Sequence, residues 1–134
     1  MTLHEAPEWL EKDTILALHG ESLAEHGGGE GLRDEGLLES ALARPLQLFS
    51  YGDPPPDLAA LAAAYGVGLA KNHAFVDGNK RIALIALITF LMVNGQRLTA
   101  SQPDAYQTMI RVASGTVSDE DLAEWIRANC EPLA

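Results

Sequence analysis

The sequence has few basic residues: nine Lys and Arg side chains stand against nineteen Asp and Glu, which gives a formal net charge of −10. Proteins that bind nucleic acid over a broad surface need clustered Lys and Arg to displace counterions, so this balance argues against a nucleic-acid-binding function. It still allows one local anion site, and it would suit a basic partner segment.

Cysteine is also scarce, since Cys130 is the single one in the chain. An internal disulfide and a metal site built from several thiolates are therefore excluded, and we expect a reducing, cytoplasmic location. His4, His19 and His26 do not have the paired spacing of metal ligands, so a zinc site is not expected.

No stretch has the length and composition of a membrane span or a leader peptide. The apolar stretch 82–93, in which Thr89 is the only polar residue, has twelve residues, against about 20 that a bilayer crossing needs. The first residues are acidic and interrupted by Pro7, unlike a secretory leader. We expect a protein that does not enter the membrane, with residues 82–93 as a core helix.

Capping residues and helix-stopping glycines and prolines divide the chain into predicted helices. The first expected helix has a cap at Asp13 or Thr14 and a stop at Gly27–Gly29, and the second has a cap at Asp34, with Pro45 limiting its continuation. The third is the apolar segment 58–71, and the fourth starts near Gly78 or Asn79 and stops at Asn94–Gly95. The fifth has a cap at Ser101 and a stop at Gly115, and the sixth has a cap at Ser118 and an end near Asn129. Only segment 96–100 has strand character, as one arm of a small β-hairpin. We predict one all-α domain over residues 1–134, a compact bundle around a buried central helix.

The residues that indicate chemistry lie in the stretch "HAFVDGNKR", residues 73–81, directly before the apolar segment. A helix start carries unpaired N–H groups and about half a positive charge, so it favours an anion such as phosphate. Gly78 and Asn79 lie at this start, and Lys80 and Arg81 add two charges. Arg81 can also hold a phosphate through two parallel hydrogen bonds.

Asp77 would repel a phosphate unless a cation lay between them. Mg²⁺ resolves this conflict, because it takes one or two carboxylates together with phosphate oxygens and waters. His73 would then be placed as a general base for an incoming hydroxyl. These roles describe phosphoryl or nucleotidyl transfer from a magnesium nucleotide.

Each residue also has a purely structural interpretation. His73 suits a structural hydrogen bond, residues 77–79 suit a turn with an N-cap, and Lys80 with Arg81 suits a solvated first turn. Phe75 is expected to be a buried anchor for the loop. The convergence of several charged and hydrogen-bonding groups at one helix start is what favours a site.

A second glycine-rich segment, Gly27–Gly31, does not form a phosphate-binding loop. It is not followed by Lys-Ser/Thr and does not follow a hydrophobic strand, so it is expected to be a flexible turn.

The stretch 73–81 resembles the signature of the Fic/Doc (Fido) family, His-Pro-Phe-x-Asp/Glu-Gly/Ala-Asn-Gly/Lys-Arg, with Ala74 in place of the proline. The segments "LALH", "GLRDEGLLESALARP" and "RIALIALITFLMVNG" resemble the death-on-curing (Doc) branch. The resemblance implies a small helical Fido fold whose motif loop leads into the central helix. The implied roles are a base at His73, a Mg²⁺ carboxylate at Asp77, an anion-binding helix start at Gly78 and Asn79, and phosphate contacts at Lys80 and Arg81.

Two further departures from the signature bear on the reaction. Lys80 stands where nucleotidyl-transferring Fic enzymes have Gly, and Leu84 stands where they have a second Arg. The Doc branch shares both features, and its best-known member phosphorylates a threonine of elongation factor Tu. The resemblance therefore implies γ-phosphate transfer from ATP by a translation-arresting toxin, with adenylylation and a non-catalytic binding module as alternatives.

The resemblance also bears on control. Many Fic enzymes carry an inhibitory Ser/Thr-x-x-x-Glu-Gly/Asn helix, and Thr116 and Glu120 have that spacing, but Asp121 follows. Restraint is then expected from outside the chain, from a prevent-host-death type antitoxin of a type II toxin–antitoxin system.

Overall fold

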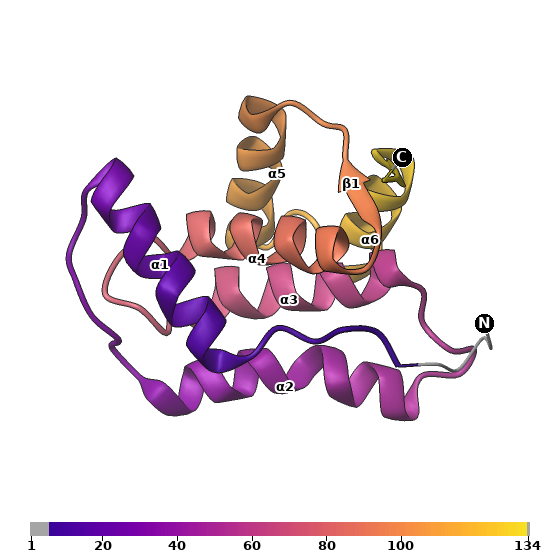
Figure 1. Ribbon diagram of the computed structural model, residues 1–134, viewed down its shortest axis with the longest axis horizontal. Helices are drawn as coiled ribbons and strands as arrows, with labels where there is room; N and C mark the ends of the chain where they lie inside the picture. Colours follow the sequence, from indigo (N-terminus) through magenta and orange to yellow (C-terminus); the bar gives the residue numbers. More distant parts are fainter. Residues whose placement is uncertain (1–5, 134) are drawn as a thin grey trace.

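The computed structural model describes residues 6–133, which fold almost entirely into helices (Figure 1). In chain order, the elements are α1 (Lys12–His26), α2 (Glu35–Tyr51), α3 (Leu58–Asn72), α4 (Asn79–Val93), β1 (Gln96–Leu98), α5 (Gln102–Ser114), α6 (Asp119–Ala128) and β2 (Cys130–Pro132). The predicted all-α class is confirmed. No helix within residues 6–133 combines the length and the apolar character that a membrane crossing requires.

Side-chain caps define the starts of four helices. Asp34, Asp57, Ser101 and Ser118 each accept a hydrogen bond from the backbone N–H three residues further on. Such caps satisfy donors that have no partner within the helix, and each is typically worth about 1 kcal/mol. The caps predicted at Asp34, Ser101 and Ser118 are confirmed.

The predicted start of α1 was wrong by two or three residues. The helix begins at Lys12 after Glu11, and the side chain of Glu11 makes no capping bond. Asp13 lies inside the first turn, where its negative charge interacts favourably with the helix dipole without acting as a cap.

The prediction that Pro45 limits α2 was also wrong, because the helix continues through it to Tyr51. Proline removes the N–H that would bond to the carbonyl of Ala41. Both residues belong to the buried face of α2, which lies close against α3: a Cβ added to Gly68 would be 3.2 Å from the Cα of Ala41. Burial of this face offsets the missing hydrogen bond.

The core is centred on α3 and α4, which run side by side (Figure 1). α2 covers α3 on one side, and α5 and α6 lie on the other. Residues 61–70 of α3 are all buried, as their apolar character predicted. α4 begins at Asn79 and ends before Asn94, as predicted, and residues 73–78 of the motif lead directly into its first turn.

The two strands form a small antiparallel sheet in which Arg97 lies opposite Glu131. The strand predicted within 96–100 is confirmed, but α5 and α6 separate it in sequence from its partner. It therefore does not belong to a tight hairpin. Instead, the sheet joins residues 130–132 to the segment that follows α4.

Candidate active site at the start of α4

Residues 73–78 form the motif loop between α3 and α4, and its two ends have left-handed backbone conformations. His73 caps α3 at φ 51° and ψ 47°, and Gly78 caps α4 at φ 77° and ψ 21°. Among residues 6–133, His73 is the one non-glycine residue with a positive φ. This conformation costs about 1–2 kcal/mol for a residue with a Cβ, and such strain concentrates at functional sites.

Asn79 holds the loop closed through its side chain. Its Oδ1 accepts from the backbone N–H of Phe75, and its Nδ2 donates to the carbonyl of the same residue, both at 3.0 Å. Phe75 is 2% exposed, which confirms it as a buried anchor. Because the amide of Asn79 is used within the loop, the phosphate contact predicted for this residue is left to its backbone N–H.

The segment between α1 and α2 supports the loop from outside. Nε of Arg33 donates to the carbonyl of His73 at 2.7 Å, and the backbone N–H of Val76 donates to the carbonyl of Gly31 at 3.1 Å. The backbone N–H of Gly29 reaches Oδ2 of Asp77 at 3.3 Å. The glycine segment, predicted only as a turn, is therefore a wall of the site.

A cavity of about 300 Å³ lies at the N-terminus of α4. Its lining consists of Ser22, Leu23, His26, Gly27, Gly28, Asp77, Gly78, Arg81 and Tyr106. Of the predicted site residues, Asp77, Gly78 and Arg81 meet here. His73 is exposed at the other end of the loop, Lys80 is half-buried on the first turn of α4, and neither of them lines this cavity.

Tyr106 of α5 holds the guanidinium of Arg81, whose Cζ lies 4.5 Å from the centre of the tyrosine ring. A cation over an aromatic face is attracted by the ring's quadrupole. Sequence reasoning missed Tyr106, as it missed Ser22 and His26, because all three come from helices far from the motif in the sequence.

The carboxylate of Asp77 is oriented by backbone donors and can accept further ligands. Oδ1 accepts from the N–H of Gly78 at 2.9 Å and Oδ2 from the N–H of Gly29 at 3.3 Å, which leaves lone pairs on both oxygens. Within the part of the chain that the structure describes, no three His, Cys, Asp or Glu side chains gather into a metal cage. A lone, oriented carboxylate suits Mg²⁺ that brings phosphate oxygens and waters with it.

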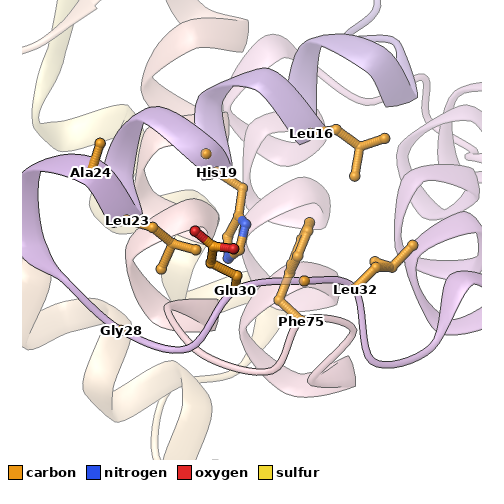
Figure 2. A pocket seen from close by; sticks show the side chains of 10 residues that line it. Leu16, His19, Leu23, Ala24, Gly28, Glu30, Leu32 and Phe75 are labelled. Carbon is orange, nitrogen blue, oxygen red and sulfur yellow. The ribbon is translucent and has the colours of Figure 1, made fainter.

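His19 of α1 contacts the loop from the core side. It is 4% exposed, its Nε2 lies 2.8 Å from the carbonyl oxygen of Asp77, and its ring stacks on Phe75 with 3.8 Å between ring centres (Figure 2). Both rings line a second cavity of about 370 Å³, enclosed by α1 and residues 28–32. The sequence placed His19 in the "LALH" segment that resembles the Doc branch and gave it no role in the site.

Comparison with known proteins identifies the family of this chain. A model described as "Fic/DOC family" matches residues 9–91, which run from before α1 almost to the end of α4. The chain belongs to the Fic/DOC family. The match includes the Fic/DOC motif loop, His19 and the glycine segment, whereas Tyr106 lies outside it.

Two relatives place this Fic/DOC protein in the Doc branch. The chain is 48% identical over 94 residues to "Toxin Doc" of Mycolicibacterium smegmatis, which covers 69% of each chain. It is 30% identical over 118 residues to "Protein kinase doc" of Escherichia phage P1, which covers 88% of this chain and 92% of the relative. The resemblance that the motif indicated is confirmed.

Proposed function

We propose that the protein is a Doc-like toxin that transfers the γ-phosphate of Mg-ATP to a Ser or Thr hydroxyl of a target protein and thereby arrests translation. One observation carries the proposal: Asp77, Gly78 and Arg81 surround a single cavity at the N-terminus of α4. They supply a carboxylate for Mg²⁺, a helix start for an anion and a cationic phosphate clamp. The relatives named Toxin Doc and Protein kinase doc support the same activity.

In the proposed reaction, the acceptor hydroxyl oxygen forms a bond to the γ-phosphorus. The bond from that phosphorus to the bridging oxygen of the β-phosphate breaks, and ADP leaves with the electron pair. The imidazole of His73 takes the hydroxyl proton. Arg81 and the N–H groups at the start of α4 hold the phosphate oxygens, and Lys80 adds positive charge at the same turn. When bound, Mg²⁺ neutralises charge between the phosphates and Asp77.

Leu84 favours phosphate transfer over adenylylation, the alternative reaction. It occupies the position of the second Arg of nucleotidyl-transferring Fic enzymes, and here it is 7% exposed and packed in the core. A clamp on the distal phosphates is thus missing from that position. The presence of Lys80 instead of Gly contributes less to this choice, because Lys80 does not line the cavity and so does not crowd it.

Elongation factor Tu is the candidate target, on family resemblance, and a prevent-host-death type antitoxin is the candidate inhibitor. Glu120, which has the spacing of an inhibitory glutamate, lines a different cavity of about 490 Å³ between α2, α3 and α6. This position supports restraint by a separate chain rather than by the toxin's own helix.

A labelling experiment tests the proposal. The purified protein and its His73→Gly variant are incubated with Mg²⁺ and a bacterial extract, in parallel reactions with ATP labelled at the α- or at the γ-phosphate. The proposal predicts label in a protein band from γ-labelled ATP only, and its loss with the variant. Label from the α position would mean adenylylation, and no transfer from either would favour the binding module.

A further inference from the structure

The peptide between Asp77 and Gly78 occupies a sensitive place in the site. Its N–H belongs to Gly78, which lines the cavity, and donates to the Asp77 carboxylate at 2.9 Å. Its carbonyl points away from that N–H, because a trans peptide is planar and directs the two groups to opposite sides. The orientation of this one peptide plane therefore decides whether the Gly78 N–H can hold the Asp77 carboxylate.

Glycine makes this peptide plane easy to rotate. Gly78 has no Cβ and adopts φ 77°, so little steric hindrance opposes a flip of the preceding peptide. The amide of Asn79 fixes Phe75, and the N–H of Gly29 fixes the Asp77 side chain, but neither holds the Asp77 carbonyl. Within residues 6–133, the hydrogen bond that the Asp77 carbonyl accepts comes from Nε2 of His19.

His19 is suited to hold this carbonyl firmly. A carbonyl oxygen only accepts, so Nε2 of His19 must carry a hydrogen. The ring is fixed by its stack on Phe75 at an interplanar angle of 18° (Figure 2). It also lies next to Gly78, since a Cβ added there would be 3.6 Å from Nε2.

We infer that His19 is a positioning residue: through its Nε2–H it fixes the Asp77–Gly78 peptide, and so keeps the Gly78 N–H on the Asp77 carboxylate and orients that carboxylate for the magnesium nucleotide. His19 itself does not line the 300 Å³ cavity, and its recorded hydrogen bond is to the backbone of Asp77. The role at the nucleotide rests on the proposed function. The hold on the peptide does not, and it is tested separately.

Two substitutions separate the hydrogen bond from the packing. His19→Phe keeps an aromatic ring against Phe75 but removes the donor. His19→Gln keeps an N–H donor the same number of bonds from Cα but removes the ring. Ile15→Val, at a fully buried position one turn earlier on α1 that lines neither cavity, is the control for a loss of packing in this helix.

The first readout needs no nucleotide: the backbone amide resonances of Gly78 and Asn79 in a ¹⁵N-labelled sample. The inference predicts that His19→Phe shifts or broadens them, while His19→Gln and Ile15→Val leave them near the wild-type positions. Wild-type resonances in His19→Phe would overturn the inference, as would an equal perturbation in the Phe and Gln variants, because then the ring and not the donor would hold the loop.

The second readout is the γ-phosphate transfer rate. We expect His19→Phe to lower kcat about tenfold to hundredfold, as loss of an outer-shell partner typically does, with KM for the acceptor protein unchanged. His19→Gln should restore most of the rate. Equal rates in the Phe variant and the wild type would contradict the inference. If the wild-type protein transfers no phosphate, the proposed function fails, and the amide resonances still decide the inference.

Discussion

The guanidinium of Arg81, the last residue of the motif, lies 4.5 Å from the ring centre of Tyr106 on α5. The motif is therefore completed by a side chain from outside the segment that matches the family model. Both residues line the cavity at the start of α4. The stack limits the directions in which the guanidinium can point, and in the proposed function it orients the guanidinium for a phosphate before any ligand binds.

This pairing predicts coupled effects on nucleotide affinity. Tyr106→Leu removes the ring under the guanidinium, and Arg81→Lys removes the planar fork, so each should weaken Mg-ATP binding about tenfold, equivalent to about 1.4 kcal/mol. The double variant should lose less binding free energy than the sum of the losses in the two single variants, because the ring acts through Arg81. Calorimetric titration of all four proteins with a non-hydrolysable ATP analogue measures the coupling. Strict additivity would show that Tyr106 does not act through Arg81.

The left-handed conformation of His73 makes His73→Gly the cleanest test of its proposed role as a base. Glycine adopts φ 51° without strain but makes the unfolded chain more flexible, so these effects offset and the free energy of unfolding should change by less than about 1 kcal/mol. The transfer rate should fall on the order of 10² to 10⁴. Urea denaturation and initial rates give the two values. His73→Asn, which also tolerates this conformation, should behave in the same way.

Asn79 should prove to be a structural residue as well as a motif residue. Asn79→Ala leaves the buried N–H and carbonyl of Phe75 without their side-chain partner, at about 1–3 kcal/mol for each unpaired group. We therefore expect a lower free energy of unfolding together with a loss of transfer activity. Asn129→Ala, which removes a single amide contact with Trp125 away from the site, is the control and should lose stability without losing the transfer rate.

The ion pair between Asp57 and Arg127 gives a pH-dependent prediction for stability. The hydrogen bond from Arg127 lowers the pKa of Asp57 below its ordinary value. A lowered folded-state pKa adds stability above the unfolded-state value, and this stability is lost as the pH falls through the folded-state value. Because the pair is about half exposed, we expect no more than about 1 kcal/mol from it.

Asp57→Asn isolates this contribution, since Asn also caps α3 well and the variant loses only the charge. Its deficit in unfolding free energy should be constant between pH 5 and 8 and should shrink below about pH 4 as Asp57 protonates in the wild type. Chemical denaturation across this range measures it. A deficit that persists unchanged in acid would assign the effect to the cap instead of to the ion pair.

The sequence predicted those features that depend on neighbours along the chain. Caps at Asp34, Ser101 and Ser118 and the burial of Phe75 follow from local patterns, and the structure has all of them. The placement of Asp77 and Arg81 at one cavity also follows, because both lie within a turn of the same helix start.

Features that depend on tertiary packing could not be predicted from local sequence patterns. Pro45 was expected to limit a helix, and only the contact of α2 with α3 shows why the helix continues. His19 and Tyr106 reach the site from α1 and α5, at distances along the chain that no local spacing encodes. The close approach of the Gly28–Gly29 backbone to Asp77 was hidden for the same reason.

The most direct test of the account is the affinity for Mg²⁺ and a non-hydrolysable ATP analogue, measured by calorimetry on the wild type, Asp77→Asn and Glu30→Gln. Glu30 lines the neighbouring 370 Å³ cavity and is the matched carboxylate control. We predict that removing Mg²⁺ or introducing Asp77→Asn weakens binding at least about tenfold, and that Glu30→Gln leaves it unchanged. Equal affinity in Asp77→Asn and the wild type would contradict the assignment of the site.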